Sequence, residues 1–221
     1  MNFRTLAAAA ALALAALPAW AVTTTFDLAA DPQHEGWWRW NDDGSHTVSD
    51  GVLHVEAPSY YEFFAPADVW RDRVTNRGGW AIETRMRRDP SSVGTPGMWI
   101  QDRKYLTLVG FTGSGLEIGD DGAFHGSYAV DTSAFHTYRF EGKGDGLRVF
   151  VDGLLALDLG VTTPGWATFD VAFGDNNRFT SGFSSSDWDY VTVTAIPLPA
   201  GAWLMGAGLL ALAGVAARPR A

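Results

Sequence analysis

The chain has 221 residues, of which 47% are hydrophobic and 19% are charged. This length and composition suffice for one domain with a sizeable core, and they exclude global disorder. The formal net charge of -9 disfavours nucleic-acid binding, because phosphate backbones are bound by clustered Lys and Arg. The absence of cysteine excludes disulfide bonds, thiolate zinc sites and a cysteine nucleophile.

Residues 1–21 have the three-part layout of a secretory signal peptide. A positive charge at Arg4 is followed by an apolar run from Leu6 to Leu17, and Ala19 and Ala21 form a small-x-small cleavage motif. The apolar run is shorter than the roughly 20 residues that span a bilayer as a helix. We therefore expect a signal helix that is removed after Ala21, with an uncleaved anchor as the alternative.

A second targeting segment is expected at residues 196–221. An uncharged stretch runs from Ala200 to Ala217, and Arg218 and Arg220 follow it. A stretch of about 18 residues can cross the hydrocarbon core as a helix, and arginines beyond it favour the cytoplasmic side. The sequence therefore predicts a C-terminal transmembrane helix. The short motif in front of it consists of Ile196, Pro197, Leu198, Pro199 and Ala200.

Motif, apolar helix and basic end together resemble the PEP-CTERM class of bacterial sorting signals, in its VPLPA variant, with Ile196 in place of the valine. The resemblance implies export in a Gram-negative bacterium to the cell surface or extracellular matrix. It also implies recognition by a membrane-embedded processing enzyme of the exosortase type, and at least transient anchorage in the inner membrane. The class is associated with bacteria that form biofilms. A simple single-pass anchor is the alternative.

Residues 22–195 show short apolar or alternating runs separated by Gly, Asp, Asn and Pro, with no long stretch at helical period. This pattern predicts an all-β domain, and the number of runs suits a two-sheet jelly roll. In residues 80–87, Ile82, Thr84 and Met86 are expected on one face of a strand. The expected strands are residues 51–56, 80–87, 98–101, 105–111, 116–118, 127–130, 136–141, 147–151, 154–159, 168–173 and 188–195.

The strongest local signal is a predicted hairpin between residues 135–140 and 147–153. The two runs alternate, and the glycine-rich turn between them ends in Asp145-Gly146, where glycine accepts a positive φ. Together with the closing run at residues 187–193, this segment resembles the concanavalin A-like or laminin-G-like jelly-roll superfamily. The resemblance implies a concanavalin A-like two-sheet sandwich and a tendency toward glycan recognition, but no particular reaction.

The sequence offers no recognisable catalytic site. A retaining jelly-roll glycanase needs two carboxylates about 5 to 5.5 Å apart, commonly in an E-x-D-x-x-E strand. Here Glu83 is followed by Arg85 and Arg87, and Glu117 is followed by a turn. Neither a G-x-S-x-G elbow nor an H-E-x-x-H motif occurs. We therefore predict no catalytic residue and a protein that is not an enzyme, with a glycoside hydrolase as the less favoured alternative.

Tryptophans and polar turn residues are the candidates for ligand contact. Sugar rings stack on indole, and their hydroxyls require partners such as Asp and Asn. Consecutive strand residues point to opposite faces, so neighbouring tryptophans cannot all be buried. The candidate glycan-binding residues are Trp37, Trp38, Trp40, Asp175, Asn176 and Asn177. Core packing is the alternative, and it is the favoured assignment of Trp80, Trp99 and Trp188.

Calcium is the candidate cofactor. It takes six to eight oxygen ligands, which acidic turns can supply, and the laminin-G-like resemblance implies calcium binding at loops. Asp120 and Asp121 lie in one such turn and Asp175 in another, so these three are the candidate metal ligands. The alternative is that the residues serve the backbone chemistry of the turns.

These expectations describe an exported bacterial surface or extracellular-matrix protein that binds a glycan or exopolysaccharide without catalysis. The expected partners are an exosortase-type processing enzyme, an exopolysaccharide or glycan, and the bacterial membrane through the C-terminal helix. Two other classes remain open. A structural surface protein would have no specific ligand, and a polysaccharide-degrading glycoside hydrolase would cleave one.

Overall fold

The computed structural model of the chain describes residues 21–41, 43–102, 104–120, 123–161, 164, 170–175 and 182–196. Residues Val22–Ile196 form one compact unit. The predicted signal peptide up to Trp20 and the predicted sorting tail from Pro197 onward lie outside the described residues. In the part of the chain that is described, no helix has the length and apolar character to cross a membrane.

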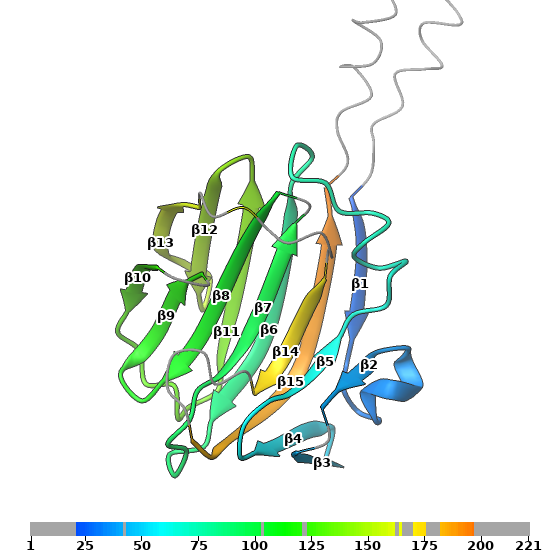
Figure 1. The fold of residues 1–221 in the computed structure, drawn as a ribbon, viewed down its shortest axis with the longest axis vertical. Coiled ribbons are helices and arrows are strands. Elements are labelled where there is room, and N and C mark those ends of the chain that lie inside the picture. Colours follow the sequence, from blue (N-terminus) through cyan, green and yellow to red (C-terminus); the bar gives the residue numbers. More distant parts are fainter. Residues whose placement is uncertain are drawn as a thin grey trace, which may run out of the picture. The chain divides into compact units, whose positions relative to one another are not determined.

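The described strands form two antiparallel sheets (Figure 1). Sheet A contains, in order, β13 (Leu154–Gly160), β12 (Gly146–Val151), β11 (His136–Lys143), β6 (Trp80–Arg88), β15 (Ser184–Ala195), β4 (Val52–Ala57) and β3 (Ser45–Ser49), and β1 (Val22–Phe26) also pairs with β15. Sheet B contains, in order, β10 (Phe124–Tyr128), β9 (Gly115–Gly119), β8 (Tyr105–Thr112), β7 (Pro96–Asp102), β14 (Val171–Asp175), β5 (Tyr61–Phe64) and β2 (Trp38–Trp40). A short 3-10 helix, η1 (Pro32–Glu35), precedes β2.

The predicted fold class, an all-β jelly-roll sandwich, is confirmed. Alternate residues of the strands in sheet A point into the core. Leu53 and Val55 of β4 are buried, and Ile82, Thr84 and Met86 of β6 are all buried as expected. Strands β1, β2, β3 and β5 were not predicted. The expected strand at residues 168–173 overlaps β14 (Val171–Asp175), and residues 168 and 169 lie outside the described ranges.

The predicted hairpin is present as β11 and β12. Lys143 pairs with Gly146, which leaves a two-residue turn of Gly144 and Asp145. The positive φ of 65° is at Gly144, and not at Gly146 as expected, because Gly146 already belongs to β12. A second hairpin joins β12 to β13 through Asp152 and Gly153, whose φ angles are 50° and 79°. Two successive positive φ values are those of a type I′ turn, the turn that matches the twist of paired strands.

Aromatic rings fill the space between the sheets. Trp188 packs against Phe173, with ring centroids 4.9 Å apart, and Phe173 also contacts Trp37 at 4.9 Å. Trp80 and Trp188 belong to this core, as favoured above. Trp37 belongs to it too and is only 2% exposed, so the prediction that Trp37 stacks on a sugar is wrong. A buried indole at this position closes the core beneath β2.

Sheet B also carries apolar residues on its outer face, the face that points away from sheet A. Inward positions such as Met98 and Val109 join the core, while the alternate positions form a second buried cluster. This cluster consists of Trp99, Leu106, Leu108 and Ala172, with Phe64 packed against it. Trp99 therefore lies on the outer face of sheet B instead of in the sandwich core.

Candidate functional site

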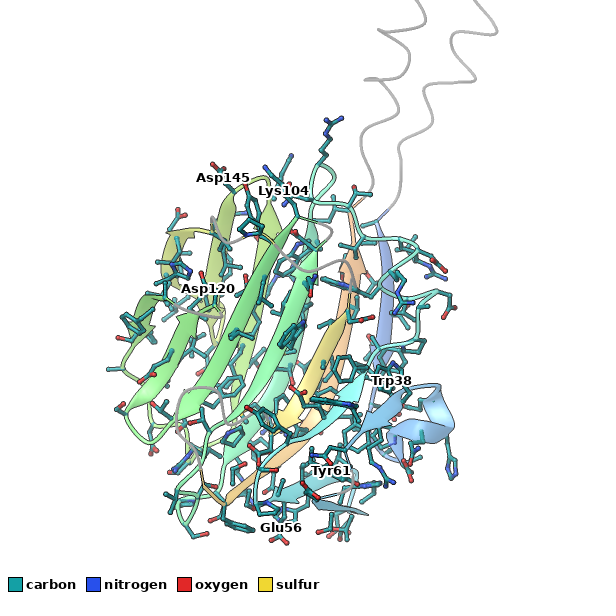
Figure 2. The ribbon with its side chains drawn as sticks, in the orientation of Figure 1. Trp38, Glu56, Tyr61, Lys104, Asp120 and Asp145 are labelled. Carbon is teal, nitrogen blue, oxygen red and sulfur yellow. The ribbon has the colours of Figure 1, made fainter. Side chains whose placement is uncertain are left out.

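Four aromatic side chains form an aromatic platform, defined here as Trp38 and Trp40 on β2, Phe64 on β5, and Tyr60 just before β5. Trp38 and Trp40 are 46% and 48% exposed. The Trp38 ring stacks on Phe64 with centroids 4.5 Å apart and an interplanar angle of 18°. Trp40 lies edge-on to Phe64 at 6.4 Å and tilted against Tyr60 at 6.2 Å. Figure 2 shows Trp38 at the β2 margin of the sandwich.

Pairing between β2 and β5 explains this arrangement. Trp38 pairs with Phe64 and Trp40 with Glu62, so these side chains share the outer face of sheet B. Arg39 points to the opposite face, where its guanidinium lies 5.6 Å from the centre of the Tyr61 ring. Strand alternation thus exposes both tryptophans on one face, while Arg39 between them contacts Tyr61 on the other face.

A hydrogen-bonded chain holds β2 on its inner side. Arg39 donates to the hydroxyl of Tyr61 at 3.3 Å, and Nδ1 of His46 lies 2.6 Å from the same hydroxyl. Nε2 of His46 lies 3.3 Å from a carboxylate oxygen of Asp31. Burial by itself raises the pKa of Asp31, but hydrogen bonds from the Gln33 amide and from His46 outweigh it and lower the pKa. These hydrogen bonds therefore hold β2, and the two tryptophans that it carries, in a fixed position.

Polar side chains adjoin the platform at the turn after β2. Asn41 donates to a carboxylate oxygen of Asp43 at 3.3 Å, and the Ser59 hydroxyl donates to the same oxygen at 3.4 Å. Asn41 follows Trp40 and Ser59 precedes Tyr60 in the chain, so this polar rim borders the rings. Sugar hydroxyls need such donors and acceptors next to an apolar surface.

A single register row crosses the outer face of sheet B from the platform. The row has one residue per strand and runs through Trp40, Glu62, Gly174, Gly97, Gly110, Glu117 and Ser127. No side chain stands between the two glutamates, because the three central residues are glycines. At Gly174 a Cβ would lie 2.3 Å from the carbonyl oxygen of Tyr61, and φ is 133°, so glycine is required there.

The two glutamates of this row are too far apart to act as a glycosidase pair. Glu62 on β5 and Glu117 on β9 are separated by β14, β7 and β8. Four strand spacings amount to about 19 Å, whereas retaining and inverting enzymes need carboxylates about 5 to 9.5 Å apart. Glu62 is also buried, at 2% exposed.

The candidate metal ligands are not assembled into a site in the described structure. Asp120 accepts a hydrogen bond from the Ala123 amide at 2.8 Å and lies 2.5 Å from Nε2 of His125. Asp175 ends β14, and β7 and β8 separate it from β9, so these two aspartates lie apart; Figure 2 shows Asp120 far from the β2 margin. Within the described ranges, no group of three or more His, Asp or Glu side chains could hold a metal ion.

Asp175 is 1% exposed, so the prediction that it contacts a sugar is wrong. Asp121, Asn176 and Asn177 lie outside the described residues. Tyr60, Phe64 and Ser59 were not predicted as contact residues. In the sequence, only the aromatic run from Tyr60 to Phe64 indicates them. It is the pairing of β5 with β2 that brings this run next to Trp38 and Trp40.

A cavity of about 480 Å³ lies elsewhere, beside Trp80, Gly142, Lys143, Arg148 and Ile196. It includes no residue of the aromatic platform or of the row across sheet B. Its walls carry charges of both signs, since Glu141 and Arg148 are ion-paired at 2.6 Å. This cavity is therefore separate from the aromatic platform.

No family model matches the chain, and no curated protein matches it in sequence. Solved structures do share its fold. An alginate lyase, AlgAT5 from polysaccharide lyase family 7, is 12% identical with a TM-score of 0.54, over 70% of this chain and 84% of the lyase. The Crh5 transglycosylase in complex with NAG is 13% identical with a TM-score of 0.57, over 80% and 85%. A prokaryotic β-1,3-1,4-glucanase (lichenase) from a mouse hindgut metagenome is 14% identical with a TM-score of 0.53, over 79% and 100%.

These similarities establish a concanavalin A-like jelly roll of the kind found in glycan-active proteins. They also correct one prediction. The absence of an E-x-D-x-x-E strand led us to expect a protein that is not an enzyme, but the similar structures include lyases, hydrolases and transglycosylases. A missing motif of one glycosidase type is no ground for excluding catalysis on this fold, because one fold hosts several chemistries.

Proposed function

We propose that the protein is carbohydrate-active and holds a polysaccharide chain against the aromatic platform on the outer face of sheet B. The observation that carries this proposal is the pair Trp38 and Trp40, two half-exposed indoles fixed side by side on an edge strand. Pyranose rings present apolar C–H faces, and an indole covered by such a face loses contact with water.

The surroundings of the two indoles support a sugar over another apolar ligand. Asn41, Asp43 and Ser59 border the rings with hydrogen-bonding groups, as a polyhydroxylated ligand requires. The rings are also preorganised, since Trp38 is stacked on Phe64 and Arg39 is bonded to Tyr61. Less side-chain entropy is then lost on binding.

The charge of the chain favours a neutral polysaccharide. A formal net charge of -9 repels polyanions over the range of a Debye length. We therefore expect neutral β-glucans to bind more tightly than alginate or carrageenan at low salt. Raising the salt concentration should narrow that difference.

Affinity electrophoresis of the full-length chain in gels that contain each polysaccharide tests the proposal. Trp38→Ala and Trp40→Ala should each weaken binding at least about tenfold, because each removes an aromatic contact surface. Phe124→Ala is the matched control, since Phe124 is 62% exposed on the distant edge strand β10. Equal loss in all three variants, or no retardation by any polysaccharide, would refute the platform and favour a structural surface protein.

Cleavage of the bound chain is the second candidate, favoured by the fold that the protein shares with lyases, hydrolases and transglycosylases. Hydrolysis would release reducing ends, whereas a lyase would create an unsaturated sugar that absorbs in the ultraviolet. Glu62→Gln and Glu117→Gln separate the roles of the two glutamates in the row across sheet B. If the polysaccharide is retained but neither product forms, binding alone is the activity.

We propose further that the chain is exported and that its tail is processed by an exosortase-type enzyme. The order of the proline motif, the apolar stretch and the terminal arginines supports this proposal. In a Gram-negative host that has such an enzyme, replacing Pro197 and Pro199 by alanine should prevent tail removal and retain the protein in the membrane fraction. Unchanged mass and fractionation of the double variant would rule out recognition of the motif.

A further inference from the structure

The sandwich is polar at one end, where β6 finishes and β15 begins, at the lower end in Figure 1. Inward-pointing residues of β6 are apolar or small up to Met86, and the next inward position is Arg88. The side chains gathered at this end are buried and polar, and they comprise Arg88, Ser92, Thr132, Ser184, Ser185 and Ser186.

Arg88 is a buried cation without a salt-bridge partner among the described residues. The residue is 9% exposed, and its Nη2 donates a hydrogen bond to the carbonyl of Ser92. Its Nε is buried and has no hydrogen-bond acceptor, and Arg88 takes part in no ion pair with the described residues. Burial lowers the pKa of Arg88, and the neighbouring charge of Asp89 only partly opposes this effect. The guanidinium nevertheless stays charged at every physiological pH.

The neighbouring carboxylate does not serve as the missing partner. A carboxylate oxygen of Asp89 accepts hydrogen bonds from the amide and the hydroxyl of Ser91, at 2.7 and 2.6 Å. On the same strand, Arg85 and Arg87 have carboxylates of Asp189 and Asp187 at 2.6 Å. Both of these cations lie on the outer face of sheet A, where water could solvate them. The cation that most needs a counter-charge is therefore the one that lacks it.

A second buried donor lies on the same face. Ser186 pairs with Arg88 in register, and Ser184, two residues away on β15, points to the same side. The Ser186 hydroxyl already accepts a hydrogen bond from Nε1 of Trp188 at 2.8 Å. The buried Ser184 hydroxyl has no hydrogen-bond partner in the described part of the chain. Gly113 adds no bulk here, since a Cβ at Gly113 would stand 3.6 Å from Nη1 of Arg88.

We propose that Arg88 is the anchor of a small-oxyanion site at the polar end of the sandwich, one that takes sulfate, phosphate or a carboxylate. The Nε–H and one Nη–H of Arg88 present the fork that binds two oxygens of such an anion, and the Ser184 hydroxyl supplies a further donor. The bound anion then serves as the counter-charge of the Arg88 guanidinium. Because no residue of the aromatic platform takes part, the site is independent of the proposed function.

Thermal unfolding of the full-length chain tests this site. At constant ionic strength, millimolar sulfate, phosphate or acetate should raise the midpoint relative to chloride, by about 5 to 10 °C at a hundredfold excess over Kd. Low concentrations matter, because concentrated sulfate stabilises proteins without binding them. Which anion acts most strongly distinguishes a tetrahedral oxyanion from a carboxylate.

Arg88→Met should abolish this response, whereas Arg85→Met, the same substitution three residues earlier on β6, should retain it. Equal midpoints in all four salts, or a full response in Arg88→Met, would overturn the proposal.

A second measurement covers the case in which Arg88→Met does not fold. In nitrogen-15 spectra of the wild-type chain, the Nε–H resonance of Arg88 should shift on titration with sulfate, while that of Arg85 stays in place. Arg88→Lys keeps the charge but loses the fork, so its apparent Kd should rise at least about tenfold. The site would be refuted if the Arg88 resonance stayed in place even at sulfate concentrations high enough to shift the resonances of all exposed arginines.

Discussion

The outer faces of the two sheets differ although both sheets cover the same core. On sheet A the outward residues are charged and paired, as in Arg85 with Asp189 and in Arg139 with Glu141 at 2.9 Å. On sheet B the outward residues include a buried apolar cluster of Trp99, Leu106, Leu108 and Ala172, and the exposed rings of the platform adjoin it through Phe64. The outer face of sheet A is therefore a charged, solvated surface, whereas much of the outer face of sheet B is apolar and already buried.

Strand patterns reflect this difference. β6 in sheet A alternates between buried and partly exposed residues through most of its length, whereas every residue of β7 in sheet B is buried. Alternation is typical of a strand with one solvated face, and a continuously apolar strand is typical of one covered on both faces. A ligand that stacks on the platform would extend the part of the outer face of sheet B from which water is already excluded.

Leu108→Ala is the largest test of this contrast. Leu108 is 2% exposed on the outer face of sheet B, so its truncation should cost about 2 to 4 kcal/mol of unfolding free energy, as in a core. Thr192→Ala on the outer face of sheet A should cost less than about 1 kcal/mol. Urea denaturation measures both. A cost for Leu108→Ala no larger than that for Thr192→Ala would mean that the outer face of sheet B behaves as an ordinary surface.

Gly174→Ala should have the next largest effect. The new Cβ would meet the carbonyl of Tyr61 at 2.3 Å in a backbone with a φ of 133°, so we expect a loss of about 1 to 3 kcal/mol. Gly160→Ala in sheet A is the control, because its nearest contact would be 3.9 Å away. The strain falls on the pairing of β14 with β5, so polysaccharide retardation by the platform should weaken as well. Equal stability of the two variants would show that the row tolerates side chains.

His54 makes the stability of sheet A depend on pH. Burial by itself lowers its pKa, but hydrogen bonds to Asp187 at 2.6 Å and to Glu56 at 3.1 Å outweigh burial and raise the pKa above 6.5. The contribution of a raised pKa is fully present below the unfolded value and is lost as the pH rises through the folded value. The wild type should therefore exceed His54→Asn in stability by more at pH 5.5 than at pH 8.5. An NMR titration of His54 with a midpoint at or below 6.5 would contradict this expectation.

The sequence predicted those parts of the molecule that depend on local patterns. Alternation located β4 and β6, and the glycine-rich turn located the hairpin of β11 and β12. The platform could not be predicted in this way, because β2 has only three residues and the contact between Trp38 and Phe64 depends on a pairing across 26 residues of chain. Which of Trp37 and Trp38 faces the core depends on where β2 enters the sheet. For Arg88, the alternation of Ile82, Thr84 and Met86 gives the inward face, but the sequence does not show that the position lacks a counter-charge.

The smallest expected effect is that of Asp189→Asn on the outer face of sheet A. The change removes the charge that pairs with Arg85, whose side chain is 41% exposed, so solvent screens the interaction and the loss should stay below about 1 kcal/mol. It should shrink further between 0.01 and 0.5 M salt, because the Debye length falls from about 30 Å to a few ångströms. Asp102→Asn is the buried counterpart: Asp102 is 4% exposed and accepts hydrogen bonds from Nε1 of Trp80 and Nδ2 of Asn76. Its loss should be larger and nearly independent of salt. If Asp189→Asn matched Asp102→Asn in size and salt response, the charged pairs of sheet A would be structural determinants, and the contrast between the two faces would fail.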